Sequence, residues 1–110
     1  MKTAKWALLC LLTVSIINYP NPFNPLGGQI ATFECVSDAP AEASLYIYDM
    51  SARLVRQKAF NLQLSPNNRA SWDGRSELNE LVGNGVYLYR LVSNASKTTL
   101  AKGKIWVINR

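Results

Sequence analysis

The clearest alternation of hydrophobic and polar positions follows Gly85. In an extended chain Tyr87, Tyr89 and Leu91 share one side of this run, and the residues between them share the other. The loop before the run contains an Asp-Gly and an Asn-Gly dipeptide, which adopt positive φ at little cost and favour strands on both sides. We therefore expect the strand that ends at Trp72 to pair antiparallel with this run across the loop.

A second alternating run spans residues 43–49, where Ala43, Leu45 and Ile47 are expected to face inward. Gly, Pro, Asn and Ser interrupt the apolar runs roughly every 8–12 residues, and no window of about 11 residues beyond position 17 keeps a helical period. This spacing predicts an all-β fold, an antiparallel β-sandwich of about seven strands. The other strands are expected at residues 29–36, 54–60, 70–72 and 98–108, with a loop at 61–69 and Gly103 as a candidate bulge.

Two residues are candidates for the centre of the core. Trp72 stands at a strand end beside a tight turn, where a tryptophan more often fills a sandwich core than binds a sugar. Cys35 falls in register with Ala31 and Phe33 and is expected to pack rather than react. Without the leader described next, Cys35 has no second cysteine for an internal disulfide.

The first residues are typical of a secretory signal peptide. Lys2 and Lys5 precede an apolar run at positions 6–17, which is shorter than the roughly 20 residues that span a bilayer but close to the length of a signal sequence. An uncleaved anchor and a misassigned start are the competing interpretations. Export would place the chain in the periplasm, at the cell surface or outside the cell, without a stable membrane span. We expect a leader at 1–15 cut after Ser15, a proline-rich segment at 16–28 and the folded domain at 29–110.

Three closely spaced prolines follow the leader, between residues 18 and 25. Proline fixes an extended backbone and removes a hydrogen-bond donor, so this segment cannot be a central strand. We expect it to run along a sheet edge, with Tyr19 and Phe23 as apolar plugs.

The net charge of +5 is unevenly distributed. Positions 81–110 contain five cations and no acidic residue, which indicates an acidic partner surface such as a polysaccharide, a membrane or nucleic acid. The simpler interpretation, which we prefer, is that lysines on solvent-facing or edge positions keep the sheet soluble. The five cations are Arg90, Lys97, Lys102, Lys104 and Arg110.

Catalytic chemistry has little support. The sequence contains no histidine, which excludes Ser-His, Cys-His and His-ligated zinc sites. Glu77 and Glu80 would need a rigid groove to act as a carboxylate pair, but they lie in a turn-rich loop. Asp49, Asp73 and Asn84 lack calcium-loop spacing and are better explained as turn caps. We expect no enzyme activity, no catalytic or metal-binding residue and no cofactor.

The tyrosines leave one binding interpretation open. Tyr46, Tyr48, Tyr87 and Tyr89 would form a stacking platform for a ligand if two of them lay side by side on an exposed face. Cross-strand aromatic pairing within the sheets is the alternative, and we prefer it.

Four motifs in a fixed order resemble a known family: the proline segment, the tyrosine strand at 45–49, the Trp-Asp-Gly turn and the Gly-Val-Tyr strand. Together they resemble the C-terminal sorting domain (type A) of the bacterial type IX secretion system. They resemble equally the immunoglobulin-like domain of flagellar hook-capping proteins. The match covers about residues 18–110. Its structural motif positions are Pro20, Asn21, Pro22, Phe23, Trp72, Asp73, Gly74, Gly85, Tyr87 and Tyr89.

The resemblance implies an immunoglobulin-like sandwich without a catalytic role. In the secretion system such a domain stands at the C-terminal end of a larger protein and directs it across the outer membrane. It is commonly cleaved off as the cargo is attached to a surface polysaccharide. The implied partners are secretion machinery or cell-surface proteins and polysaccharide, not nucleic acid. The sorting information would lie in the closing strand and tail, at Lys102, Lys104, Ile105, Val107 and Arg110.

One motif departs from the family pattern, because the turn after Asp49 normally carries a glycine where Ala52 stands. We therefore expect a different type of turn. The leader runs almost directly into the proline segment, so the chain is either the tail of a larger gene product or an exported module that acts alone. In order of preference, the candidate functions are a sorting or surface-anchoring module, a scaffold module like the hook cap that associates through strand edges, and a carbohydrate-binding module.

Overall fold

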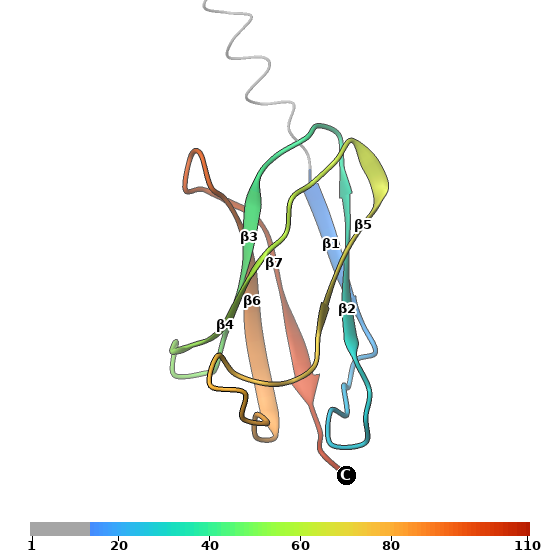
Figure 1. Cartoon of the computed structure of the whole chain (residues 1–110), viewed down its shortest axis with the longest axis vertical. Helices are drawn as coiled ribbons and strands as arrows, with labels where there is room; N and C mark the ends of the chain where they lie inside the picture. The colour runs from blue at the N-terminus through green and yellow to red at the C-terminus, as the bar shows by residue number, and fades with distance from the viewer. Residues whose placement is uncertain (1–13) are drawn as a thin grey trace, which may run out of the picture.

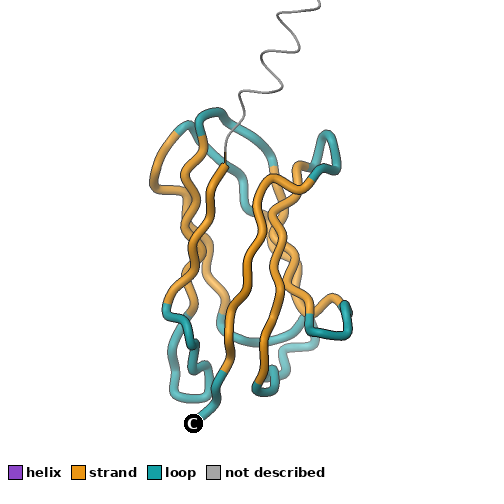
Figure 2. Tube along the Cα trace, turned by 180° about the vertical axis from the view of Figure 1, so that it is seen from behind, coloured by secondary structure: helices purple, strands orange, loops and turns teal. Residues whose placement is uncertain are grey.

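A computed structural model describes residues 14–110 as two antiparallel sheets packed face to face (Figure 1). The predicted β-sandwich of seven strands is confirmed, and the described residues contain no helix. The loops gather at the two ends of the sandwich (Figure 2). One sheet has the order β1 (Val14–Tyr19), β2 (Ala31–Ser37), β5 (Ser65–Trp72); the other has the order β4 (Leu54–Ala59), β3 (Ala43–Tyr48), β6 (Gly85–Ser93), β7 (Thr99–Val107).

The pairing predicted across the loop at 73–84 is wrong. β5 pairs with β2, whereas β6 pairs with β3 and β7, so the loop crosses from one sheet to the other. Turn dipeptides favour strands on both sides but do not decide which strands pair. Trp72 and Tyr87 each point inward and meet across the sandwich, with ring centroids 5.9 Å apart. Non-consecutive neighbours of this kind are typical of the immunoglobulin-like architecture.

Two strands differ from the sequence-based expectation. β5 begins at Ser65 rather than at residue 70, and it includes Pro66 because an edge strand tolerates a proline. β1 contains the last four residues of the apolar run at 6–17, paired with β2. The expected cleavage point after Ser15 therefore falls within β1, and the leader up to residue 13 lies outside the described residues.

The core follows the alternation of the strands. Ala31, Phe33 and Cys35 of β2 are fully buried, as are the three predicted inward residues of β3. Trp72 is 1% exposed, and its indole N–H donates to the Arg75 carbonyl at 2.9 Å. A buried indole needs such a partner for its only polar atom. The predicted core roles of Trp72 and Cys35 are confirmed.

Ala52 adopts the left-handed conformation in the turn after β3, with φ of 65°. The Asp49 carboxylate accepts hydrogen bonds from the backbone N–H groups of Ser51 and Arg53 at 2.9 and 3.0 Å, and these bonds lower the pKa of Asp49. Glycine adopts this conformation at lower cost than alanine. The turn thus keeps a left-handed residue at Ala52 even though the glycine is absent.

Ala52→Gly is expected to stabilise the fold by about 0.5–1 kcal/mol, because relief of the left-handed strain exceeds the added entropy of the unfolded chain. Urea unfolding followed by tryptophan fluorescence measures the change. Ala59→Gly, at the exposed end of β4, is the matched control and is expected to destabilise by about 0.5–1 kcal/mol. Equal losses in both variants would contradict the strain at Ala52.

The buried Cys35 thiol is expected to make the free energy of unfolding decrease at alkaline pH. Burial raises its pKa from 9.0 to about 12, so the folded state keeps the proton while the unfolded state loses it. The stability that the protonated thiol contributes is fully present below the pKa of the unfolded state, and it is lost as the pH rises from about 9 to about 12. Cys35→Ala should therefore lower stability at pH 7 but flatten the decline between pH 9 and about 11. Urea unfolding across this range tests the prediction, and parallel declines in the two proteins would refute it.

Candidate recognition surface

The predicted sorting residues of β7 point to two different sides. Ile105 and Val107 are buried in the core, whereas Lys102 and Lys104 are exposed on the outer face. Alternation along a strand explains the division. Trp106 shares the outer face and is 55% exposed. A partner that binds the folded domain can therefore contact the two lysines and the indole but not the two aliphatic side chains.

The proline-rich segment covers the end of β7. The Phe23 N–H donates to the Trp106 carbonyl at 2.7 Å, and the Ile108 N–H donates to the Phe23 carbonyl at 2.9 Å. The Trp106 N–H donates to Oδ1 of Asn21 at 3.0 Å. Pro20 and Pro22 have no N–H to offer this edge. The expectation that the segment follows a sheet edge is confirmed.

The two predicted plugs of this segment behave differently. Phe23 is fully buried, with its ring centroid 5.7 Å from that of Trp72, as expected. Tyr19 is 42% exposed and its hydroxyl donates to Glu34 at 3.1 Å, so its assignment as a plug is wrong. It lies on the outward side of β1, because the alternation that partly buries Val14 and Ile16 turns it to solvent.

Asparagine side chains hold the C-terminal tail. Oδ1 of Asn84 accepts a hydrogen bond from the Asn109 N–H at 2.7 Å, and Nδ2 of Asn109 donates to the Val82 carbonyl at 3.0 Å. Oδ1 of Asn24 accepts a hydrogen bond from the Arg110 N–H at 3.1 Å. The backbone of Arg110 is thus fixed between the proline-rich segment and the loop before β6, while its side chain is exposed.

The Trp-Asp-Gly motif is a structural turn. Oδ1 of Asp73 accepts a hydrogen bond from the Arg75 N–H at 3.0 Å, which confirms the predicted turn cap. Gly74 has φ of 79°, and a Cβ at this position would overlap the Pro25 ring. The turn therefore lies directly against the proline-rich segment, which explains why the two motifs occur together.

The start of β6 is also structural. Gly85 pairs with Val107, and the Tyr87 hydroxyl donates to the Gly83 carbonyl at 2.8 Å. Burial raises the pKa of Tyr87, so its hydroxyl stays protonated. These contacts anchor the first residues of β6 beside the C-terminal tail.

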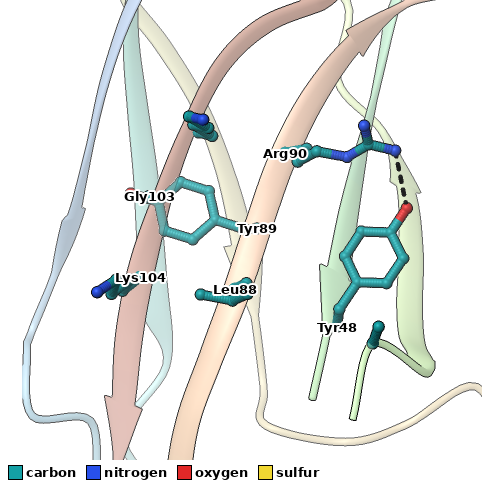
Figure 3. A pocket seen from close by; sticks show the side chains of 8 residues that line it. Tyr48, Leu88, Tyr89, Arg90, Gly103 and Lys104 are labelled. Carbon is teal, nitrogen blue, oxygen red and sulfur yellow. Dashed lines mark hydrogen bonds between the residues drawn. The ribbon is translucent and has the colours of Figure 1, made fainter. Parts of the chain in front are cut away.

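A groove of about 670 Å³ lies on the outer face of the second sheet, over β6 (Figure 3). Two cross-strand rows of side chains cross this face: Tyr48, Leu88 and Lys104 in one row, and Tyr46, Arg90 and Lys102 in the other. The rows join β3 to the consecutive strands β6 and β7, which follow it by more than 35 residues. The groove therefore combines cations, tyrosines and an aliphatic floor.

The Arg90 guanidinium is held in place within the groove. It lies over the Tyr48 ring, 5.6 Å from the centroid. It also donates to the Tyr48 hydroxyl at 3.2 Å, as Figure 3 shows. A second N–H donates to Oγ1 of Thr99 at 3.3 Å. Contact with an aromatic face stabilises a cation by about 0.5–1 kcal/mol at exposed sites. Sequence reasoning did not single out Arg90 for this role.

The tyrosines do not form the cross-strand aromatic pairs that we preferred. Tyr46 and Tyr48 lie side by side along β3, with ring centroids 6.3 Å apart and planes 18° apart. Tyr87 and Tyr89 are buried and pack against aromatic rings of the other sheet. The strand register explains the difference, because it places Arg90 opposite Tyr46.

Gly103 lines the groove and lies opposite Tyr89. The two residues are in register, and the bulge lies instead between Leu91 and Val92, so the assignment of Gly103 as a bulge is wrong. The Tyr89 ring passes over Gly103 on the core side, and its hydroxyl donates to Oδ1 of Asn18 in β1 at 2.6 Å. This hydrogen bond links the two sheets where β1 and β7 lie beside each other (Figure 2).

Glu77 has a structural role in the described part of the chain. Glu77 lies 3.3 Å from Arg56 in an ion pair and accepts the backbone N–H of Gln57 at 3.2 Å, which satisfies part of the β4 edge. Within residues 14–110 no three His, Cys, Asp or Glu residues lie close enough to hold a metal ion. No helix in this range is long and apolar enough to cross a membrane.

The fold and this surface define a class: an immunoglobulin-like β-sandwich that presents a shaped outer face and a pinned C-terminal tail. No family model matches the chain, and no curated protein matches it. Among solved structures the chain is similar to dimeric latent PorU of Porphyromonas gingivalis, with 28% identity and a TM-score of 0.71 over 88% of this chain. It is also similar to PorZ of the same organism, an essential surface component of the type IX secretion system, with 26% identity and a TM-score of 0.60 over 84%.

Both neighbours are type IX secretion components, which agrees with a type IX-related immunoglobulin-like domain. The chain spans only 9% of PorU and 11% of PorZ. It therefore corresponds in size to one module of these longer proteins.

Gly103→Ala is expected to destabilise the fold by about 1–3 kcal/mol, because the new Cβ would overlap the Tyr89 hydroxyl and ring. Gly83→Ala is the matched control, since no atom lies within 4 Å of its added Cβ, and it should change stability by at most about 0.5 kcal/mol. Urea unfolding measures both. A Gly103→Ala variant as stable as the control would mean that the Tyr89 ring is not confined at this place.

Proposed function

We propose that this chain is a non-catalytic sorting or surface-anchoring module, which directs an attached protein through the type IX secretion system to the cell surface. The observation that carries the proposal is the similarity of 88% of the chain to a part of PorU, at a TM-score of 0.71 and 28% identity. The similarity to PorZ, a surface component of the same system, supports an exported or surface location. The partner is then a component of the secretion machinery or of the cell surface.

The division of β7 supports a role in recognition. Its inward residues hold the strand in the core, while Lys102 and Lys104 remain available on the outer face. Hydrogen bonds from two other segments fix the tail that ends at Arg110. A partner thus meets a preformed surface and need not pay the entropy of ordering it.

The covered edges of two strands disfavour the alternative function, a scaffold that self-assembles through unpaired strand edges. The end of β7 is occupied by Phe23, and the edge of β4 is bonded to Glu77 through the Val55 carbonyl and the Gln57 N–H. Covered edges are a usual protection against edge-to-edge association. Sorting therefore agrees better with this surface than self-assembly does.

A fusion tests the proposal. A periplasmic reporter enzyme joined to residues 14–110 is expected to reach the surface of a host that has the type IX system, as measured by reporter activity on intact cells. The control fusion ends at residue 98 and lacks β7 with its tail; it should stay in the periplasm. Surface activity in a host without the system, or none in a host that has it, would contradict the proposed function.

A further inference from the structure

The outer face of β6 and β7 brings three cations together without a carboxylate. Arg90 and Lys102 are direct partners in the β6–β7 register, and Lys104 lies two residues further along β7. Like charges directly opposite each other on a sheet repel, so this arrangement costs free energy until an anion approaches. Within residues 14–110 the ion pairs use arginines of the turn after β3, of β4 and of β5, and none involves these three cations.

Apolar surface continues beside the cations. Leu88 lies between Tyr48 and Lys104 in its cross-strand row and forms the floor of the groove. The next outward residue of β7 is Trp106, and it lines an adjoining hollow together with Met50, which is 67% exposed. The partner of this face therefore carries both negative charge and at least one apolar group.

The position of Arg90 disfavours stacking of a neutral sugar on Tyr48. Stacking of a sugar needs a free aromatic face, and the guanidinium lies over the Tyr48 ring. Arginine has five N–H donors, and the bonds to Tyr48 and Thr99 use two of them. The remaining donors suit a carboxylate, which accepts strong charge-assisted hydrogen bonds.

We propose that this face binds an extended acidic peptide of a partner protein, in the pattern acid-x-acid-x-apolar. Along β7 the outward residues are Lys102, Lys104 and Trp106, and alternate positions of an extended chain are roughly 6.6 Å apart. A peptide with the same repeat places a carboxylate near each ammonium group and an apolar side chain near the indole. The inference rests on the proposed function, because the partner would belong to the secretion machinery.

An NMR titration of the full 110-residue chain tests the inference. The probe is the peptide Ser-Glu-Ser-Glu-Ser-Leu-Ser, and a peptide with Gln in place of Glu is the neutral control. The acidic peptide is expected to shift the amide signals of Lys102 and Lys104 and the indole signal of Trp106. It should bind at least about fivefold more tightly than the neutral one. The difference should shrink between about 50 mM and about 300 mM salt, because salt screens exposed charges.

Matched charge reversals locate the contact. Lys104→Glu is expected to weaken binding about fivefold, whereas Lys97→Glu, the same charge change in the turn between β6 and β7, should change it less than about twofold. Equal effects of the two variants would assign the affinity to net charge alone and overturn the inference. Absence of shifts on this face would also overturn it. Binding of polygalacturonate here, without binding of the peptide, would assign the face to an anionic glycan instead.

The reporter fusion separates this inference from the proposed function. The double variant Lys102→Glu/Lys104→Glu in the fusion is expected to lose at least about tenfold of the surface activity, while Lys97→Glu keeps it. If the unaltered fusion is exported but the double variant is exported equally well, the peptide inference fails and the proposed function stands. If the unaltered fusion is not exported, the proposed function fails whatever the titration shows.

Discussion

The structure depends on a contact between three aromatic rings from three separate segments. Trp72, at the end of β5, lies between Phe23 of the proline-rich segment and Tyr87 of β6, at centroid distances of 5.7 and 5.9 Å. Tilted and edge-on ring contacts add about 0.5–1.5 kcal/mol per pair to the burial of the rings. This cluster closes one end of the sandwich. It also explains why the proline motif, the Trp-Asp-Gly turn and the Gly-Val-Tyr strand occur in the same sequence, since each supplies or positions one ring.

β7 contributes to the core and to the outer surface at once, so the proposed recognition surface depends on the stability of the fold. Its inward side contributes Ile105 and Val107 to the core, and Gly103 leaves room for the Tyr89 ring that links the sheets. Its outward side is polar and cationic. A partner that contacts the outward side would therefore bind only the folded domain, because the inward contacts fix the position of the strand.

The sequence alone predicted the sandwich, the inward faces of β2 and β3, and the burial of Trp72 and Cys35. These follow from alternation and from turn residues, which act locally. It placed the start of β5 five residues late, because Pro66 is typical of a loop and becomes acceptable only on an edge strand. It assigned residues 14–15 to a leader and residues 16–17 to the proline-rich segment, although all four pair with β2, because an apolar run has the same composition in a signal sequence and in a strand.

The sequence predicted the candidate site only in part. Charge counting identified Lys102 and Lys104, and the alternation of β7 separates them from Ile105 and Val107. The register between β3, β6 and β7 places Arg90 over Tyr48 beside the two lysines. The same register directs Tyr89 to the core. The sequence by itself determined which residues are extended and which are buried, since both depend on neighbours along the chain. Only the tertiary structure decided which strands share a sheet and which charges meet, because a loop of twelve residues such as 73–84 is long enough to join either sheet.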